Sequence, residues 1–168
     1  MAGKFFDQLQ KYHGLGERER LLLRLAAILH DCGKFISMSA PGECAYQIIM
    51  STEILGISHM EREMVACIVR YNTMELPNFS EFDGKLGNDK YLIVMKLAAI
   101  LRVCNALDRS HRQKFADMKL TIKDSNIVIT TAYPDNITLE KKTLKDKQDF
   151  FEEVYGLGFE IKQKKKKQ

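Results

Sequence analysis

The 168-residue chain is long enough for one medium-sized domain, alone or with a small appendage. Hydrophobic residues make up 45% of it and charged residues 29%, a balance that excludes a disordered chain. No apolar run reaches the roughly 18 residues that a membrane-spanning helix needs, and the opening residues, MAGKFFDQLQ, lack the apolar core of a signal peptide. We therefore expect a soluble, cytoplasmic protein without a membrane partner.

The formal net charge of +4 depends on one short segment. Four lysines, Lys164 to Lys167, are consecutive, and the rest of the chain is near neutral. A run of this kind is typical of a solvated chain end, and contact with a nucleic acid is the weaker interpretation. We expect residues 164–168 to form a basic tail and the protein to bind no nucleic acid.

The cysteines are widely spaced, and no two of them form a C-x-x-C pair. They are Cys32, Cys44, Cys67 and Cys104. All but Cys44 lie in apolar stretches of helical pattern, so we expect buried thiols of a protein from a reducing compartment. Their spacing predicts no zinc site.

Apolar residues at helical spacing predict five helices in the first two-thirds of the chain. They are expected at about residues 2–12, 17–31, 43–55, 58–70 and 89–107. Gly33 is a stop signal just beyond the second helix, and Ser58 with Glu61 gives the capping-box pattern at the start of the fourth. Residues 72–88 have no periodicity and contain one proline and two glycines, which predicts a loop.

The pattern changes near Met118. The segment KLTIKDSNIVITTAY has two alternating β-branched runs on either side of Asp124-Ser125-Asn126, which predicts a β-hairpin. A short third strand is expected at Ile137–Glu140, an amphipathic helix in LKDKQDFFEEVYG and a last strand in GFEIK. These residues predict a small α+β unit of the order of 50 residues, which would need to pack on the helices for stability.

His30 and Asp31 end the apolar helix in LLLRLAAILHDCGKFI. A neutral imidazole nitrogen and a neighbouring carboxylate oxygen can hold one divalent metal ion, and such an ion can activate water to attack a phosphate. The alternative is a pair that caps the helix and bonds to its backbone. Asp31 is unfavourable at a helix C-terminus, which favours some compensating role. The pair is typical of an HD-type helical domain, in which further ligands come from other helices.

Longer segments carry a family resemblance. In chain order they are LQKYHGLGERERLLLRLAAILHDCGKFIS, CAYQIIMSTEILGISHMEREMVACIVRYN, LAAILRVCNALDRSHRQKF and ITLEKKTLKDKQDFFEEVYG. Together they cover nearly the whole chain and resemble the C-terminal region of the exopolyphosphatase / guanosine pentaphosphate phosphatase family. The resemblance implies a helical domain that helps to bind polyphosphate and contributes to dimer contacts. It also implies partner domains of actin-like ATPase fold that carry the hydrolysis, and this chain has none of their glycine-rich phosphate loops.

The chain departs from the pattern of a complete HD metal site. The only upstream histidine, His13, stands beside glycines, and SMSAPGECAY supplies no ligand. Asn72 follows Arg-Tyr where many family members have histidine, and Asn105 stands where the closing aspartate would align. Asp108 is one helical turn further on. The remaining candidate ligands for Mg²⁺ or Mn²⁺ are His30, Asp31 and Asp108, and we expect no metal to be bound tightly.

Basic residues gather where the last of the five helices ends, in LRVCNALDRSHRQKF. Cations favour a helix C-terminus, so dipole complementarity on a solvated face is one interpretation. The other is an anion site, because arginine offers forked donors that match phosphate oxygens. The candidate phosphate-binding residues are Arg102, Arg109, His111 and Arg112, together with Lys34 and Arg70.

The sequence therefore predicts a mainly α protein, in which an HD-like helical bundle at residues 1–116 precedes a small α+β subdomain at 117–163. The leading function is the polyphosphate-binding or regulatory part of an exopolyphosphatase-type phosphohydrolase, with polyphosphate or a phosphorylated guanosine nucleotide as ligand. A stand-alone, metal-dependent HD phosphohydrolase acting on nucleotides or guanosine tetra- or pentaphosphate is the second hypothesis. A non-catalytic module that forms a homodimer is the third. No catalytic residue is assigned, and the chain alone is not expected to contain a complete active site.

Overall fold

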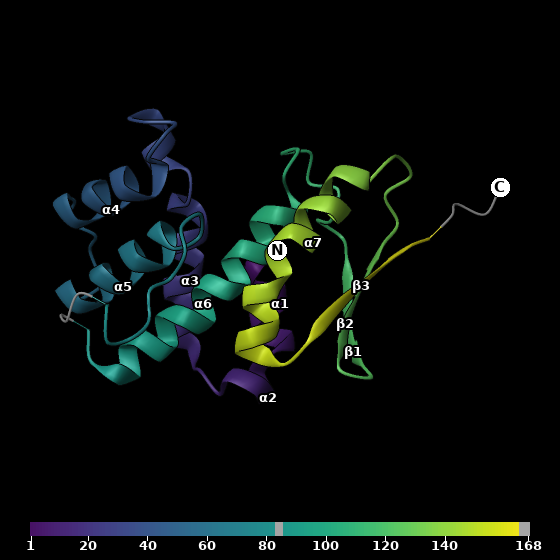
Figure 1. Ribbon diagram of the computed structural model, residues 1–168, viewed down its shortest axis with the longest axis horizontal. Helices are drawn as coiled ribbons and strands as arrows, with labels where there is room; N and C mark the ends of the chain where they lie inside the picture. The colour runs from purple at the N-terminus through teal and green to yellow at the C-terminus, as the bar shows by residue number, and fades with distance from the viewer. Residues whose placement is uncertain (83–85, 165–168) are drawn as a thin grey trace. The chain divides into compact units, whose positions relative to one another are not determined.

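The structure is a computed structural model that describes residues 1–82 and 86–164. The chain forms two compact units (Figure 1). The helical unit is Leu15–Leu101, and the sheet unit combines Met1–Gly14 with the described part of Arg102–Gln168. Among the described residues, no helix is long and apolar enough to cross a membrane. The predicted basic tail falls, except for Lys164, outside the described residues.

The helical unit contains four of the five predicted helices, in the predicted order. They are α3 (Glu17–Leu29), α4 (Pro41–Ser51), α5 (His59–Arg70) and the start of α6 (Asn88–Leu107). A short 3-10 helix that was not predicted, η1 (Cys32–Phe35), follows α3. The capping box is confirmed, since Ser58 Oγ accepts from the Glu61 amide at 3.2 Å and the Ser58 amide donates to the Glu61 carboxylate at 2.7 Å. Of the described part of the predicted loop, residues 72–88, only Asn88 belongs to a helix or strand, as the first residue of α6.

The predicted end of the third helix, at residue 55, was wrong by four residues. The helix α4 ends at Ser51 because the Thr52 backbone is extended, with φ −105° and ψ 138°. The Thr52 hydroxyl then donates to the Ile48 carbonyl at 2.7 Å, which satisfies one of the last carbonyl groups of the helix. Apolar spacing continued beyond this point and therefore did not reveal the end.

Close backbone packing fixes the position of η1 against α4. A Cβ atom on Gly33 would lie 1.9 Å from the Pro41 carbonyl oxygen and 2.6 Å from the Ala45 amide nitrogen, so only glycine fits there. Gly42 likewise allows close contact between α4 and α5, because a Cβ atom on it would lie 2.8 Å from the Arg70 carbonyl oxygen. The pair His30-Asp31 therefore leads into a rigidly packed turn.

The sheet unit contains a three-stranded sheet, with the strands in the order β1-β2-β3. Its elements are α1 (Ala2–Gln8), α2 (Gln10–His13), β1 (Lys119–Lys123), β2 (Asn126–Thr131), α7 (Thr138–Tyr155) and β3 (Gly158–Gln163), with the end of α6. β1 and β2 are antiparallel, and β2 and β3 are parallel, with α7 as the connection between them. The hairpin prediction is confirmed, because Asp124 and Ser125 have φ of 48° and 59°, as a type I′ turn requires.

The prediction of a third strand at Ile137–Glu140 was wrong, because α7 begins at Thr138. The Asn136 side-chain oxygen accepts from the Thr138 amide at 2.6 Å and starts the helix. Ile137, Glu140 and Leu144 then lie three and four residues apart, and all three are buried. Four residues, ITLE, are too few to distinguish a strand from a first helical turn.

Aromatic rings fill the core of the sheet unit. Phe151 of α7 lies 4.7 Å from Phe159 of β3, and Phe5 of α1 lies 6.4 Å from the same ring, measured between centroids. Lys4 also donates to the carbonyl of Ala116 at 2.7 Å. The first residues of the chain therefore pack with the sheet, whereas the sequence analysis grouped residues 1–116 together. The predicted domain boundary at residue 116 stays a prediction, while the fold is confirmed as mainly α with a small α+β part.

Candidate phosphate-binding loop

A compact turn follows α6 in the sheet unit, and we call Asp108–Lys114 the basic loop. The His111 amide donates to the Asp108 carbonyl at 2.8 Å, and the Gln113 amide donates to Asp108 Oδ1 at 2.9 Å. His111 and Gln113 have backbone φ angles of 53° and 51°, in the left-handed region that residues other than glycine rarely adopt. Asp108 therefore organises the turn, and one of its carboxylate oxygens is occupied by the backbone.

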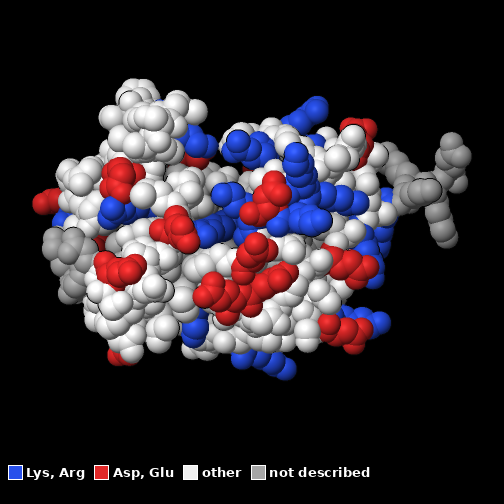
Figure 2. All heavy atoms as spheres, viewed as in Figure 1, with Lys and Arg blue, Asp and Glu red and all other residues white. Residues whose placement is uncertain are grey.

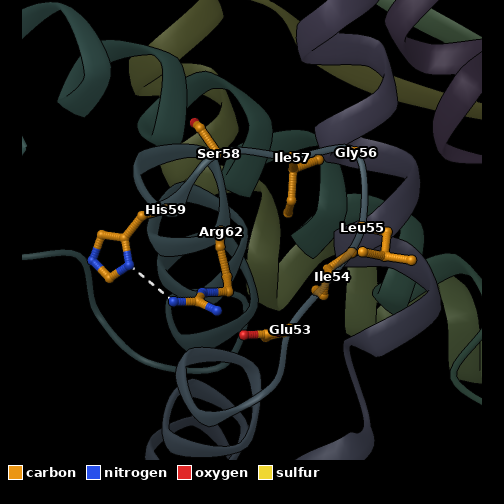
Figure 3. Close-up of a pocket in the computed structure, with 8 residues that line it drawn as sticks. All are labelled: Glu53, Ile54, Leu55, Gly56, Ile57, Ser58, His59 and Arg62. Carbon is orange, nitrogen blue, oxygen red and sulfur yellow. Dashed lines mark hydrogen bonds between the residues drawn. The ribbon is translucent and has the colours of Figure 1, made fainter.

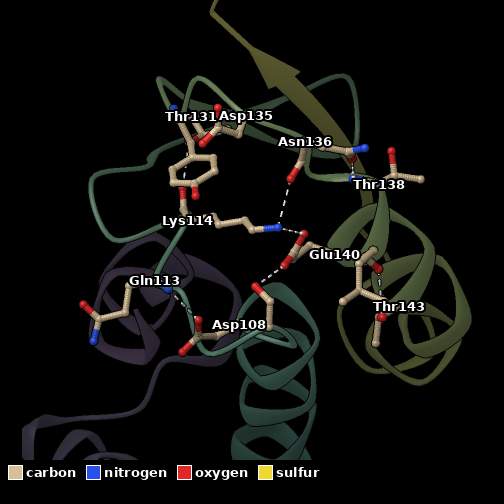
Figure 4. A network of polar contacts seen from close by, with 12 residues as sticks. Asp108, Gln113, Lys114, Thr131, Asp135, Asn136, Thr138, Glu140 and Thr143 are labelled. Atoms are coloured by element: carbon tan, nitrogen blue, oxygen red, sulfur yellow. Dashed lines mark hydrogen bonds and ion pairs between the residues drawn. The ribbon is translucent and has the colours of Figure 1, made fainter.

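A buried ion pair holds the end of the basic loop (Figure 4). Lys114 Nζ lies 3.0 Å from Glu140 Oε2 and donates to the Asn136 carbonyl at 2.9 Å. Ser110 Oγ donates to Glu140 Oε1 at 2.6 Å, so both carboxylate oxygens have partners. The two charged side chains are only 9% and 0% exposed, which makes the pair a part of the core. The loop is thereby attached at two points to the first turn of α7.

The environment of Glu140 keeps its carboxylate ionised. Burial by itself raises the pKa of a carboxyl group, but the hydrogen bonds from Ser110 and Lys114 outweigh this effect and lower the pKa of Glu140 below its ordinary value. A buried carboxylate is stable only when it is paired in this way. The charge of Lys114 is consequently neutralised by Glu140.

Hydrogen bonds also connect the basic loop to the sheet. The Thr131 hydroxyl, at the end of β2, donates to the Lys114 carbonyl at 2.9 Å and accepts from the Tyr133 amide at 3.1 Å. The ring of Tyr133 lies 5.8 Å from the Lys114 ammonium. Helix, strand and loop thus share one polar network, which attaches the Lys114 end of the loop to β2 and α7.

Three of the predicted phosphate-binding residues lie on this loop. Arg109, His111 and Arg112 are all exposed, and no ion pair joins any of them to another described residue. Lys114 neutralises Glu140, whereas the Asp108 carboxylate accepts from the uncharged Gln113 amide. The loop therefore exposes two arginines and a histidine against one carboxylate, an arrangement that can bind phosphate oxygens.

Arg102 has a different environment in the same unit. It lies on α6, and its guanidinium stacks over the ring of Phe150 from α7 at 4.3 Å. The structure therefore brings three of the four predicted residues of this region into one turn and places the fourth on the helix that leads to it.

The two predicted residues of the helical unit are neutralised by neighbouring acids. Lys34 Nζ lies 2.6 Å from Asp31 Oδ1. Arg70 Nη2 lies 2.6 Å from Glu43 Oε1, and its guanidinium is also 5.3 Å from the centre of the Tyr46 ring. A cation that already has a carboxylate partner attracts a phosphate less strongly.

The candidate metal ligands have their own hydrogen bonds. His30 Nδ1 donates to the Ala27 carbonyl at 2.9 Å, and its Nε2 lies 3.5 Å from Asp31 Oδ1, the oxygen that Lys34 contacts. Asp108 belongs to the sheet unit. Among the described residues, no group of three or more His, Cys, Asp or Glu side chains is placed to hold a metal ion. Metal binding by His30, Asp31 and Asp108 stays a prediction.

Another polar site lies at the start of α5, in a pocket of about 280 Å³ (Figure 3). Arg62 donates to His59 Nδ1 and to the Thr52 carbonyl, both at 2.9 Å. Arg18 from α3 binds the Glu61 carboxylate next to this pocket, with Nη2 2.8 Å from Oε2. These contacts join α3, α5 and the segment before α5, so we interpret the site as structural.

The network that supports the basic loop was not predicted from the sequence. Lys114 stood only within the basic segment LRVCNALDRSHRQKF and was not a candidate residue, and Glu140 was assigned to a strand. One signal was present, because a glutamate stood at a position of the buried face that Ile137, Leu144 and Phe151 define. A charged residue on a buried face is rarely left unpaired.

A basic loop held by a buried ion pair, on a mainly helical protein, is suited to binding phosphorylated ligands. Comparison with protein families matches residues 1–149 to Ppx/GppA phosphatase, domain III. The chain therefore belongs to the Ppx/GppA phosphatase family and corresponds to part of an exopolyphosphatase/GppA-type phosphohydrolase. A comparison with curated proteins gave no match.

Proposed function

We propose that this chain is the polyphosphate-binding, regulatory part of its phosphohydrolase, and that the basic loop is the binding surface. The observation that carries the proposal is the exposure of Arg109, His111 and Arg112 on a turn that the Lys114–Glu140 pair holds. Polyphosphate or a phosphorylated guanosine nucleotide would be the ligand. The actin-like catalytic domains of the family would carry out the hydrolysis.

The physical basis is the match between arginine and phosphate. Each guanidinium can donate two parallel hydrogen bonds to phosphate oxygens, and several cations in one turn suit a chain of repeated anions. Because the loop backbone is fixed, little conformational entropy is lost when the ligand binds. The binding is largely electrostatic, so salt weakens it steeply.

The test measures binding of polyphosphate to the chain by titration calorimetry at low and at physiological salt. The double variant Arg109→Ala/Arg112→Ala should weaken binding about tenfold, a loss of about 1.4 kcal/mol, and should flatten the salt dependence. Arg24→Ala, which removes an exposed arginine of α3, is the matched control and should change binding less than about twofold. Unchanged isotherms for the double variant would contradict the proposal.

One observation favours the alternative of a metal-dependent HD phosphohydrolase. The Nδ1–H of His30 is bound to a backbone carbonyl, which leaves the Nε2 lone pair directed to the side of Asp31. A metal ion there would have to replace Lys34 as the partner of Asp31. Elemental analysis of the Mn²⁺-loaded chain and of His30→Ala tests this alternative. Equal metal content in the two proteins would exclude it.

The proposal extends to the helix arrangement, the partners and the cellular location of the chain. We include an HD-like arrangement of the helices, contacts with the actin-like domains and a homodimer as predictions from the family resemblance. A cytoplasmic location is supported by the cysteines, because burial raises the pKa of the thiols of Cys67 and Cys104 to about 12 and keeps them unreactive. Unpaired cysteines are common in a reducing compartment.

A further inference from the structure

The strand β3 has an unpaired edge. Its only neighbour among the described strands is β2, so it lies at one end of the sheet. The Gly158 amide donates to the Ser125 carbonyl, and the Lys164 amide donates to the Thr131 carbonyl. The backbone groups of the even-numbered residues of β3 therefore point towards β2. In a parallel pair of strands, every second residue directs both its N–H and its C=O away from the neighbouring strand. Phe159, Ile161 and Gln163 therefore present their backbone groups at the outer edge.

A groove of about 380 Å³ lies over this strand. Its lining comes only from α7 and β3 and comprises Lys141, Leu144, Lys145, Gln148, Phe159 and Ile161. The four residues of α7 are spaced by three, four and seven positions and so share one face of the helix. Phe159 and Ile161 are two residues apart and share one face of the strand. No residue of β1 or β2 lines the groove, which places it over the edge strand.

The groove has an apolar floor and a basic rim. Leu144 is buried, while Phe159 and Ile161 are half-buried and form the floor together with it. Lys141 and Lys145 are exposed, and no described acid forms an ion pair with either. Figure 2 shows blue spheres over the region that contains α7 in Figure 1, with red spheres beside and between them. Acids therefore lie near the lysines of this helix, but no described acid is paired with the two lysines of the rim.

We propose that the edge of β3 and the adjoining face of α7 bind an extended acidic segment of a partner protein, which adds to the sheet as a fourth strand. The backbone of the segment pairs with Phe159, Ile161 and Gln163. Every second side chain of an added strand points to the α7 side of the sheet. Carboxylates at those positions reach Lys141 and Lys145, so acidic side chains alternating with neutral ones are the pattern that fits.

The proposal does not depend on phosphate binding, because the basic loop contributes no residue to this groove. It also differs from a general attraction of anions, because it requires a backbone with hydrogen-bonding groups. An extended chain without N–H groups, such as polyphosphate, can contact the lysines but cannot extend the sheet. The two modes of binding can therefore be separated experimentally.

The test uses an acetylated and amidated peptide of alternating Thr and Glu, nine residues long, with binding followed by amide chemical shifts in NMR at physiological salt. Shifts should concentrate at Phe159, Ile161 and Gln163. The same peptide methylated at alternate backbone nitrogens, and a peptide of alternating Thr and Lys, should both bind at least tenfold more weakly. Binding that tolerates either change, or shifts confined to the basic loop, would overturn the proposal.

Variants of the chain complete the test. Lys141→Glu/Lys145→Glu should weaken binding of the acidic peptide about tenfold. Lys142→Glu/Lys147→Glu makes the same change of charge on exposed positions that do not line the groove, and should change binding less than about twofold at this ionic strength. Equal losses in the two variants would reduce the effect to net charge and refute a defined groove.

Ile161→Pro provides an independent check on the backbone. It removes an outward N–H and leaves the β2–β3 hydrogen bonds of the even-numbered residues in place. Peptide binding should fall at least tenfold, while the circular dichroism of the chain stays unchanged. If the variant fails to fold, the methylated peptide still decides the question. Self-association of the unmodified chain that Ile161→Pro abolishes, seen by sedimentation, would also overturn the proposal.

Discussion

The helical unit and the sheet unit use their cations differently. In the helical unit, Lys34 and Arg70 each lie 2.6 Å from an acid of the same unit, Asp31 and Glu43. In the sheet unit, one lysine, Lys114, neutralises the buried Glu140, and the arginines beside it form no ion pair with a described residue. The presence of lysine or arginine is thus poor evidence for an anion site. The better evidence is a cation that forms no ion pair with a carboxylate.

The two units also differ in what holds their tight turns. In the helical unit the turn at η1 depends on shape, because Gly33 is in contact with the backbone of α4. In the sheet unit the basic loop depends on a buried charge pair. Steric and electrostatic constraints respond to different substitutions, so mutations can separate them.

The largest effect is expected when the buried pair is broken. Lys114→Met leaves the Glu140 carboxylate in the core without its cation and should lower the free energy of unfolding by roughly 3 to 5 kcal/mol. Urea unfolding followed by circular dichroism measures the loss. Lys123→Met, at a lysine whose side chain is 76% exposed, is the control and should change stability by less than about 0.5 kcal/mol. A loss for Lys114→Met as small as that of the control would refute the view that charge holds this loop.

The steric constraint of the helical unit should give the next largest effect. Gly33→Ala places a methyl group 1.9 Å from the Pro41 carbonyl oxygen and should cost about 2 to 3 kcal/mol, measured by the same urea titration. Gly87→Ala is the matched control, because a Cβ atom there meets nothing within 4 Å. If Gly33→Ala is as stable as Gly87→Ala, close packing does not define the turn at η1.

A smaller effect should follow from releasing a paired cation. Asp31→Asn leaves Lys34 without its carboxylate, so the affinity for polyphosphate at low salt should rise about twofold, or by about 0.4 kcal/mol. Glu53→Gln removes the same negative charge at an exposed position where no cation is paired among the described residues. A rise of the same size in both variants would mean that net charge, and not pairing, separates the two units.

The smallest effect concerns acid sensitivity in the helical unit. The hydrogen bonds from Arg18 and Ser58 lower the pKa of Glu61 from 4.5 to about 2. A lowered pKa adds stability above pH 4.5, and this contribution is lost as the pH falls towards 2. Glu61→Gln should therefore be less stable than the natural chain at pH 6, and most of the difference should be lost by pH 2. Thermal unfolding across this range measures it, and a difference of the same size at pH 6 and pH 2 would contradict the assignment.

Sequence reasoning succeeded where the signal is local. The helices of the helical unit were found because each has a buried face with regular spacing, and the hairpin was found because its turn residues are adjacent. The third strand was wrong because the segment ITLE is short and its helix is started by the Asn136 side chain. Local patterns determine elements, and they do so least well at their ends.

The candidate site was only half predicted for the same reason. Arg109, His111 and Arg112 are close in sequence, so their gathering was visible. The ion pairs join residues far apart in the chain, 26 positions for Lys114 with Glu140 and 43 for Arg18 with Glu61. Which cations have acidic partners is therefore a property of the tertiary fold and cannot be read from local charge patterns.

The network around Glu140 links events at its two ends. Ser110 and Lys114 belong to the basic loop, and Glu140 belongs to the first turn of α7. A ligand that binds the loop only in its folded form must stabilise every contact on which that form depends. Occupancy of the loop should therefore slow amide hydrogen exchange in the first turns of α7, which carry no candidate phosphate ligand. By thermodynamic reciprocity, local unfolding of α7 would release the ligand.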